Sequence, residues 1–408
     1  MVAVVKTESR NRFVIGALQY PAYRRYWLSG FASILGENVR LIAHFWLAWE
    51  LTKSNLFLGL LGLASGVPAV LMTLVAGQVA DRVDRRRLLM IIQIITGALM
   101  LTLGLLVFSD VIARWHVLAV AFALGIVQSF YVVSRSSMMP RLIKSEDLPS
   151  AVAFDISTFQ ASRVIAPPIA AGLILIGVEY AFFFIAIANV VACLVLIPLQ
   201  IERTALDPNN RGLQAFSAGF SYIKQNSIFA SITALSVCLG FFGLGFAIIL
   251  PSFADDVFDV GSVGYAVMSL TFGVGSLVGG LIMATLKNVN HKGRWIFLGL
   301  FLFCGLEVAF GLSPLFPISI VMLLFLGLAY SFYSIMATSE IQMRVPDELR
   351  GRVMSIYSLT WLLIPLGGFA AGAIASATSP QASVAILGTI LLAITAGVFT
   401  VSAQARKI

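Results

Sequence analysis

Twelve apolar segments follow one another along the chain, separated by short polar or basic gaps. A helix needs about 20 apolar residues to cross a bilayer. The apolar runs are continuous rather than alternating, which favours helices over barrel strands, and lipid leaves only those two options for a spanning backbone. The sequence therefore predicts an all-α integral membrane protein with spans at about 26–50, 56–80, 88–108, 115–138, 150–177, 180–199, 228–254, 262–286, 295–312, 316–340, 351–377 and 381–402.

The composition agrees with lipid as the surrounding solvent. Of the 408 residues, 59% are hydrophobic and 11% are charged, and the mean hydropathy is +0.95. Soluble domains carry about a quarter charged residues, and a globule this apolar would expose large hydrophobic patches to water. This balance argues against a soluble enzyme, a nucleic-acid-binding protein and a disordered scaffold.

The basic residues predict the orientation. The formal net charge is +8, but the Lys and Arg residues lie in the gaps between spans rather than in one patch. With both termini in the cytoplasm, 23 of the 27 fall in cytoplasmic segments, and only Lys53 and Arg114 fall in outer loops. Such an excess is typical of cytoplasmic loops, so we expect a multi-pass protein of the cell (inner or plasma) membrane and no nucleic-acid partner.

The two halves of the chain are related in sequence. Tyr131 and Leu148 recur as Tyr333 and Leu349, at offsets of 202 and 201 residues. A near-constant offset of half the chain predicts a duplicated six-helix unit, an architecture of transporters that bind substrate near the middle of the membrane. We expect an N-terminal bundle at 1–199, a cytoplasmic linker at 200–227 and a C-terminal bundle at 228–408.

The linker has an apolar stripe at helical spacing. Its members are Leu213, Phe216, Phe220 and Ile223. This spacing indicates an amphipathic segment on the inner membrane surface, and an ordinary linker helix packed on protein is the alternative.

The segment between the second and third spans, GQVADRVDRRR, carries the most specific motif. Gly77 offers a helix surface without a side chain, and Asp81 can accept bonds from the start of a neighbouring helix. The arginines hold the loop on the cytoplasmic side. We expect a conformational latch there, formed by Gly77, Asp81, Arg82, Arg85 and Arg86.

This segment resembles the signature loop of the major facilitator superfamily, Gly-x-x-x-Asp-Arg/Lys-x-Gly-Arg-Arg/Lys. Asp84 replaces the second glycine, as in a branch that includes bacterial drug and siderophore (enterobactin-type) exporters. The stretches PRLIKSEDL and VPDELRGRVMSIY resemble that branch too, so the resemblance covers essentially the whole chain. The second copy, GGLIMATLKNVNHKGR, lacks the acid, and no latch is expected there. The resemblance implies a fold of twelve helices in two pseudo-symmetric six-helix bundles.

The fifth span contains RVIAPPIAAG, with two prolines that cannot donate backbone hydrogen bonds. Small residues around them permit close helix packing. The segment is similar to the Gly-Pro-x-x-Gly-Gly motif of drug–proton antiporters in the same superfamily, and this similarity implies export. The kink would be formed by Pro167, Pro168 and Gly172. An ordinary proline kink is the alternative.

Ionisable residues inside the spans are candidates for proton coupling, because charge in lipid is costly. Glu37, Arg40 and His44 share one stripe of the first span, and Arg40 is one turn from Glu37. Asp155 and Arg163 lie on the fifth span. The alternative is a fixed ion network that positions helices. For Glu307, in the ninth span, the sequence offers no account.

Aromatic residues gather on the fourth, seventh and tenth spans, which the resemblance places around a central cavity. Flat apolar walls with a few hydroxyl groups suit an amphipathic substrate, although aromatic residues are equally normal facing lipid. The predicted cavity residues are His44, Phe130, Tyr131, Phe242, Phe246, Tyr330 and Tyr333.

We therefore predict a proton-coupled exporter (antiporter) of a small lipophilic or amphipathic molecule such as a drug, macrolide or siderophore. An importer or facilitator of a metabolite, and a membrane sensor that transports nothing, are the alternatives. No phosphate-binding loop or hydrolase motif occurs, so we expect neither catalysis nor a metal or other cofactor, with the proton gradient as driving force. The three cysteines lie in apolar runs and predict no disulfide. We expect a monomer whose partners are substrate, protons and lipid.

Overall fold

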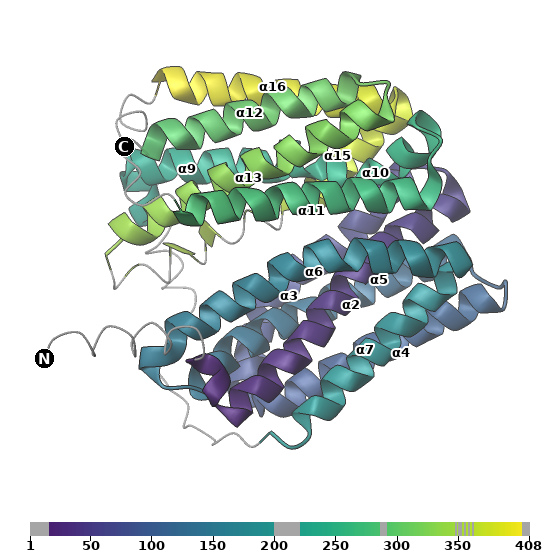
Figure 1. Cartoon of the computed structure of the whole chain (residues 1–408), viewed down its shortest axis with the longest axis vertical. Helices are drawn as coiled ribbons and strands as arrows, with labels where there is room; N and C mark the ends of the chain where they lie inside the picture. The colour runs from purple at the N-terminus through teal and green to yellow at the C-terminus, as the bar shows by residue number, and fades with distance from the viewer. Residues whose placement is uncertain are drawn as a thin grey trace, which may run out of the picture. The chain divides into compact units, whose positions relative to one another are not determined.

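The structure is a computed structural model of the chain, and every element that it describes is helical (Figure 1). It describes residues 16–199, 221–285, 292–346, 349, 353–354, 356–357, 360 and 363–401. Within these ranges the side chains of Leu74, Ala80, Asp81 and Lys292 are not described. Most of the predicted linker, at 200–220, lies outside the described residues.

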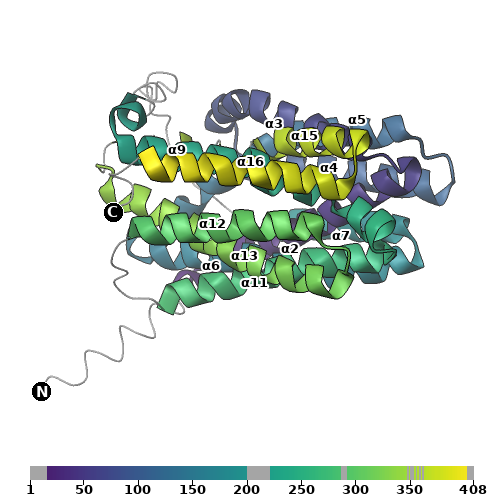
Figure 2. The same ribbon diagram turned by 90° about the horizontal axis from the view of Figure 1, so that it is seen from above.

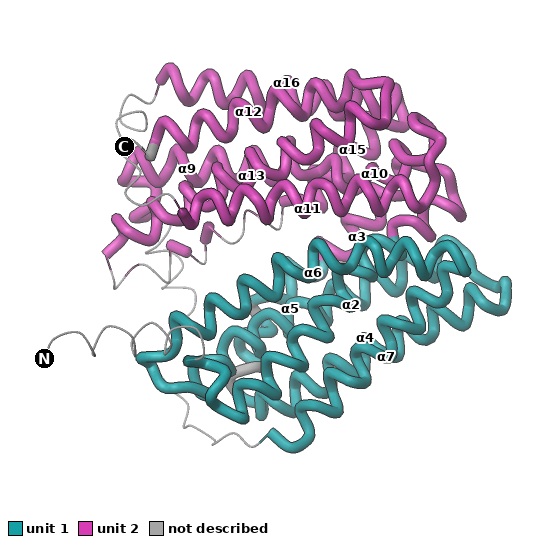
Figure 3. The backbone as a smooth tube through the Cα atoms, in the orientation of Figure 1, with its two compact units in different colours: residues 1–44, 68–206 teal, residues 45–67, 207–408 magenta. Residues whose placement is uncertain are grey.

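The chain divides into two compact units, coloured separately in Figure 3. Unit 1 contains residues 1–44 and 68–206, and unit 2 contains residues 45–67 and 207–408. Residues 45–67 thus group with the second half of the chain. This division is not the same as the predicted bundles at 1–199 and 228–408, which stay a prediction.

Unit 1 is built from long helices joined by short turns. Gly177, with a φ of 146°, makes the turn between its last two helices, and this angle favours a residue without a side chain. The elements that contribute to this unit are η1 (Ala17–Gln19), α2 (Pro21–Thr52), α3 (Asn55–Arg82), α4 (Arg85–Phe108), α5 (Arg114–Met138), η2 (Met139–Arg141), η3 (Ser145–Asp147), α6 (Leu148–Ile176) and α7 (Val178–Leu196).

Unit 2 takes the end of α2 and the start of α3 and adds the helices of the second half. In both views α12 and α16 lie side by side (Figures 1 and 2). The further elements are α9 (Ser227–Cys238), η4 (Leu239–Gly243), η5 (Leu244–Ile249), α10 (Leu250–Ser252), η6 (Phe253–Val257), α11 (Gly261–Thr285), α12 (Lys292–Leu312), α13 (Phe316–Arg344), α15 (Ile364–Ala377) and α16 (Pro380–Val401).

Ten of the described helical segments are long and apolar enough to cross a membrane. They correspond to ten of the twelve predicted spans. The first predicted span lies within α2, which is 32 residues long but carries several charged side chains. The eleventh, at 351–377, overlaps α15, which has 14 residues and follows a partly described stretch. The prediction of an all-helical, multi-pass membrane protein is confirmed.

The seventh predicted span, at 228–254, is not a plain α-helix. After α9 the backbone widens into a π-helical turn at η4, narrows into 3-10 turns at η5 and widens again at η6. Such irregular turns are concentrated at functional sites. Here they coincide with two glycines that touch neighbouring backbone. A Cβ on Gly240 would lie 2.6 Å from the Thr360 carbonyl oxygen, and one on Gly245 would lie 2.6 Å from the Gly367 carbonyl carbon.

Glycines also bring α11 and α13 into direct backbone contact. A Cβ on Gly275 would lie 2.0 Å from the Leu324 carbonyl oxygen, and a Cβ on Gly327 would lie 2.2 Å from the Phe272 carbonyl oxygen. Small residues at helix interfaces permit this approach, because packing rather than the hydrophobic effect drives helix association in lipid. Ser276 and Ser331 add a hydrogen bond of 2.9 Å between their hydroxyl oxygens across the same interface.

We expect Gly275→Ala to destabilise the protein, because the new methyl group would overlap a carbonyl group that cannot move freely. Overpacking of this kind costs about 1–3 kcal/mol. Gly305→Ala is the matched control, since a Cβ there meets no described atom within 4 Å and gains about 0.5–1 kcal/mol of helix propensity. Thermal unfolding of the two purified variants in detergent checks this. Equal melting temperatures would contradict the assigned contact.

Candidate functional site

A bidentate ion pair lies in the middle of α2. Arg40 donates from Nε to Glu37 Oε2 at 2.7 Å and from Nη2 to Glu37 Oε1 at 2.6 Å. The Arg40 side chain is 9% exposed and that of Glu37 is 30% exposed. The predicted pairing of these two residues is therefore present, and the carboxylate is the more accessible partner.

His44 continues this pair along the same stripe of α2. Arg40 Nη1 lies 3.3 Å from His44 Nδ1, and His44 Nε2 lies 3.3 Å from the Val117 carbonyl oxygen of α5. A guanidinium group only donates and a carbonyl only accepts. The two contacts together therefore require a neutral imidazole with its hydrogen on Nε2. His44 is 1% exposed, so it supports Arg40 from inside the protein.

A second ion pair joins α5 to α6. Arg135 Nη2 donates to Asp155 Oδ1 at 2.8 Å, and the side chains are 12% and 26% exposed. The Arg135 guanidinium carbon lies 4.5 Å from the centre of the Tyr26 ring, a cation–π contact. The Tyr26 hydroxyl donates to the Arg135 carbonyl oxygen at 3.1 Å.

Arg135 is not among the predicted site residues, because it was counted with the cytoplasmic basic residues and not with the ionisable residues of the spans. Asp155 is thus paired with a residue of α5, whereas the sequence grouped it with Arg163 on the fifth span. The Arg163 guanidinium instead lies 5.8 Å from the centre of the Phe159 ring. The spacing of 20 residues between Arg135 and Asp155 crosses a loop, and helical periodicity gives no signal across it.

Gly30 makes room for the Arg135 side chain. A Cβ on Gly30 would lie 1.7 Å from Arg135 Nη1, so the guanidinium group lies directly against the backbone of α2. Gly30, about two helical turns before Glu37, thus forms part of the surroundings of the second ion pair.

The predicted kink residues lie within α6, which continues through Pro167 and Pro168. Ala166, Pro167 and Ala170 are buried, which agrees with close helix packing at those positions. At Gly172 a Cβ would meet no described atom within 4 Å. The close approach that we expected at Gly172 is therefore not present among the described residues.

The loop between α3 and α4 is held by its arginines and by Asp84. The Asp84 carboxylate accepts from the backbone nitrogens of Arg86 at 2.9 Å and Arg87 at 3.2 Å, and so caps α4. Arg85 donates to the Ser137 carbonyl oxygen at 2.9 Å, and Arg86 donates to the carbonyl oxygens of Leu196 and Ile197. Those carbonyl groups end α5 and α7, where helix dipoles favour a cation.

Two latch residues do not show the expected contacts. A Cβ on Gly77 would meet no described atom within 4 Å, so no helix approaches it among the described residues. Arg82 is exposed, and the side chain of Asp81 lies outside the described set. The latch role of this loop stays a prediction.

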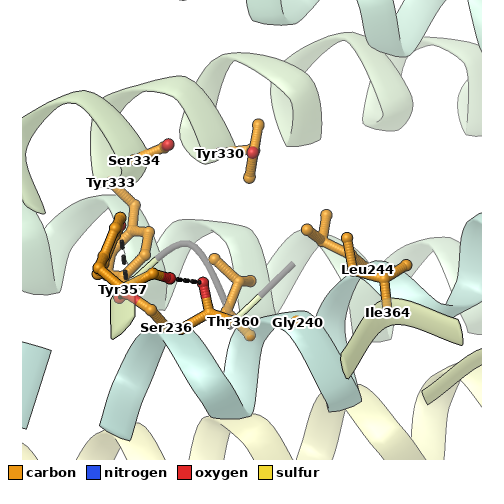
Figure 4. Close-up of a pocket in the computed structure, with 10 residues that line it drawn as sticks. Ser236, Gly240, Leu244, Tyr330, Tyr333, Ser334, Tyr357, Thr360 and Ile364 are labelled. Atoms are coloured by element: carbon orange, nitrogen blue, oxygen red, sulfur yellow. Dashed lines mark hydrogen bonds between the residues drawn. The ribbon is translucent and has the colours of Figure 1, made fainter. Parts of the chain in front are cut away.

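A pocket with many hydroxyl groups lies in unit 2, between the irregular segment after α9, α13 and the residues before α15 (Figure 4). The Ser236 and Tyr333 hydroxyl oxygens are 2.6 Å apart, and the Ser236 hydroxyl donates to the Tyr357 oxygen at 3.4 Å. No charged side chain is among its lining residues, which are Ser236, Leu239, Gly240, Leu244, Tyr330, Tyr333, Ser334, Tyr357, Thr360 and Ile364.

The predicted cavity residues fall into separate places. Tyr330 and Tyr333 line the pocket. Phe246 does not: it is 2% exposed and packs against the rings of Phe272 and Phe310 at 6.1 and 6.0 Å. Phe246 is therefore a core residue, since its side chain is buried against these two rings.

The other aromatic candidates pack locally. Phe130 and Tyr131 lie against Leu88 and Ile92 of α4 in unit 1. Phe242 makes an edge contact with Phe241, with ring centres 4.8 Å apart. Neither set lines the unit 2 pocket. The pocket could instead have been predicted from hydroxyl residues near a glycine, such as Ser236 and Gly240. This pattern was not used to predict the cavity.

One further polar cluster joins the end of α2 to η6 within unit 2. Asp255 accepts from Trp49 Nε1 at 2.9 Å and from the Lys53 ammonium group. The Lys53 nitrogen also lies 5.5 Å from the centre of the Trp49 ring. These contacts help to explain why residues 45–67 group with unit 2.

Solved structures of two transporters share the fold of this chain. A bacterial homologue of the human lysosomal transporter Spinster, in an inward-facing and occupied conformation, superposes with a TM-score of 0.76 at 14% identity and covers 95% of this chain and 97% of its own. The nucleoside transporter NupG has a TM-score of 0.69 at 16% identity over 92% and 98%. The likeness shows the fold of major facilitator superfamily transporters.

Sequence comparison gives the family within that class. The family model described as transmembrane secretion effector matches residues 14–407. The chain belongs to this family, a group of major facilitator superfamily transporters.

Two relatives are similar over most of their length. Macrolide efflux protein A of Streptococcus pyogenes is 24% identical over 353 residues, which cover 84% of this chain and 86% of the relative. Enterobactin exporter EntS of Shigella boydii serotype 4 (strain Sb227) is 24% identical over 395 residues, 91% of each chain. The resemblance to a drug and siderophore exporter branch is confirmed.

We expect Gly30→Ala to break the Arg135–Asp155 pair, because the methyl group would occupy the place of the guanidinium group. The loss is about 1–3 kcal/mol, the cost of an unpaired buried polar group. Gly36→Ala on the same helix is the control, since its Cβ would meet Ala188 at an ordinary 3.5 Å. Thermal unfolding of Gly30→Ala, Asp155→Asn and the double variant checks this. Additive losses in the double variant would contradict a shared contact.

Proposed function

We propose that the protein is a proton-coupled exporter of a small lipophilic or amphipathic molecule, such as a macrolide or a siderophore. Its twelve spans would form two six-helix bundles in the cell membrane, with both termini in the cytoplasm. The printed functions of the two relatives, macrolide efflux and enterobactin export, support export over uptake. The excess of basic residues in alternate gaps supports the orientation.

The observation that carries the proposal is the pair of Glu37 and Arg40 in the middle of a helix that is long enough to span. Protonation of Glu37 removes the charge that fixes both nitrogen donors of Arg40. The two protonation states then differ in the contacts that α2 makes. A proton gradient acts on transport through such a difference, because it shifts the populations of conformations that bind the proton unequally.

His44 and the Arg135–Asp155 pair extend the effect of Glu37 protonation from α2 to α5 and α6. His44 links Arg40 to the backbone of α5, and α5 also carries Arg135, the partner of Asp155. We therefore assign Asp155 a coupling role through Arg135 and keep Arg163 as a further candidate on α6. Both pairs belong to unit 1.

The support for a latch role of residues 77–87 comes from the bonds that anchor this loop to neighbouring helices. It does not come from a described contact of Gly77 or Asp81 with another helix. Asp84 caps α4, and Arg85 and Arg86 fix the start of this helix to the ends of α5 and α7. Such anchoring gives Asp81 and Arg82 a rigid base from which to bond another helix when the cytoplasmic side closes. Gly77 would then be the point of close approach.

The unit 2 pocket is the proposed substrate-binding surface. Its lining combines three tyrosine rings with the hydroxyl groups of Ser236, Ser334 and Thr360. Apolar walls with a few hydrogen-bonding groups are typical of sites for amphipathic ligands. The described lining residues carry no charge, which favours an uncharged, oxygen-rich part of the substrate at this surface.

We expect Glu37→Gln to lower pH-driven efflux of a macrolide from proteoliposomes by about tenfold or more, equivalent to about 1.4 kcal/mol. The amide cannot gain and lose the proton. Glu50→Gln is the control, since Glu50 is an exposed acid on the same helix. Wild-type efflux in Glu37→Gln would refute its coupling role. Accumulation in place of efflux by the wild type would show import.

We expect Ser334→Phe to fill part of the pocket and to raise the KM for the transported macrolide about tenfold, or about 1.4 kcal/mol. The maximal rate should change much less, because the ion pairs of unit 1 are untouched. The neighbouring Ile335 is 38% exposed and does not line the pocket, so Ile335→Phe serves as the control. An equal KM in the two variants would place the substrate elsewhere.

A further inference from the structure

Among the described residues, two buried acids have no role in the proposed mechanism: Glu340, which is paired with Arg344, and Glu307. Glu307 lies on α12, five residues before the helix ends at Leu312, and is 0% exposed. Neither of its carboxyl oxygens has a hydrogen-bond partner among the described residues. Buried polar groups without a partner are rare in proteins, and an ionised carboxylate in such surroundings is far more costly than a neutral one.

The side chain is enclosed by the α12–α16 interface. A Cβ on Gly388 of α16 would lie 3.2 Å from Glu307 Cγ, closer than an ordinary contact. On the same side of α12, the Cys304 sulfur lies 3.9 Å from the Thr395 hydroxyl oxygen of α16. Glycine at 388 thus makes the space that the acid occupies.

No described group near Glu307 supplies a positive charge. The sequence of α16 contains no ionisable residue. On α13, Tyr330, Tyr333 and Glu340 carry no positive charge, and the cation, Arg344, follows Tyr333 by 11 positions. The backbone of Tyr333 lies against Gly299 of α12, eight positions before Glu307, so Arg344 lies toward the end of α13 that is far from Glu307. Arg294, on α12 itself, is 13 positions from Glu307, about 20 Å along the axis.

The irregular segment after α9 adds only acids. Phe310 of α12 packs against Phe253 of η6, and η6 carries Asp255 and Asp256. Asp255 is already paired with Lys53. Among the described residues, the elements that pack against this part of α12 therefore supply no side chain that compensates the charge of an ionised Glu307.

We propose that Glu307 is a second proton-binding site, in unit 2 and separate from the Glu37–Arg40 pair. The ligand is a proton held on the carboxyl group in the described conformation. This proton exchanges with water when α12 and α16 move, and it adds to the protons that enter for each substrate molecule exported. The last statement rests on the proposed function, whereas binding and exchange of the proton do not.

Infrared spectroscopy of the purified protein tests binding without any substrate. We expect a carbonyl stretching band of a neutral carboxylic acid that is lost in Glu307→Gln and kept in Glu179→Gln, a half-buried acid at the start of α7. Wild-type protein labelled with carboxyl-¹³C glutamate provides a second measurement, because the same band must then move without any mutation. A wild type without a band from neutral glutamic acid would show an ionised Glu307 and overturn the proposal.

Transfer of the same sample to D₂O tests exchange. A band that moves to lower frequency supports a site that opens to water. A band that stays unmoved after long incubation would show a trapped, purely structural proton and would also overturn the proposal.

The transport part is tested by counting protons and macrolide molecules together in proteoliposomes that contain a pH-sensitive dye. We expect Glu307→Gln to move fewer protons per macrolide than the wild type and Glu179→Gln to match the wild type. An unchanged ratio would overturn the coupling of Glu307. A wild type that moves no macrolide would contradict the proposed function, and the infrared result would still decide whether Glu307 binds a proton.

Discussion

The bilayer offers no water to satisfy polar groups, and this constraint governs the rest of the molecule. It accounts for helices at every described element, because only internal hydrogen bonds can satisfy a spanning backbone. It also makes each charge inside a span conspicuous. Glu37 and Asp155 lie within hydrogen-bonding distance of an arginine, whereas Glu307 lies beyond reach of any described cation. The proposed proton sites therefore differ chemically, because Glu37 and Asp155 are paired with arginine and Glu307 is not.

Helical periodicity predicted the contacts within one helix but not those between helices. The stripe of Glu37, Arg40 and His44 was readable, since residues three and four apart face the same way. The partner of Asp155 was not readable, because Arg135 comes from another helix and its position depends on packing against Tyr26 and Gly30. The number of spans was largely predictable from apolar length, while the π and 3-10 turns after α9 were not, since composition does not report backbone geometry.

The resemblance to known exporters identified the family but was less informative about individual side chains. Asp84, which replaces a glycine of the signature loop, turns out to cap α4, a role that its helix-start position allowed. Phe246 was predicted for the cavity from its span, yet its ring lies in the core of unit 2. Which face of an aromatic-rich helix turns inward depends on local backbone turns, and the sequence pattern around Phe246 is apolar on all sides.

The glycines that bring α11 and α13 into backbone contact also restrict how these two helices can move relative to each other. Two helices whose main chains touch at Gly275 and Gly327 cannot slide along each other without carbonyl groups colliding. Side chains at other interfaces can change rotamer and let the helices shift. The α11–α13 pair therefore moves as one rigid body, and any bending of unit 2 must be absorbed at interfaces where side chains separate the backbones.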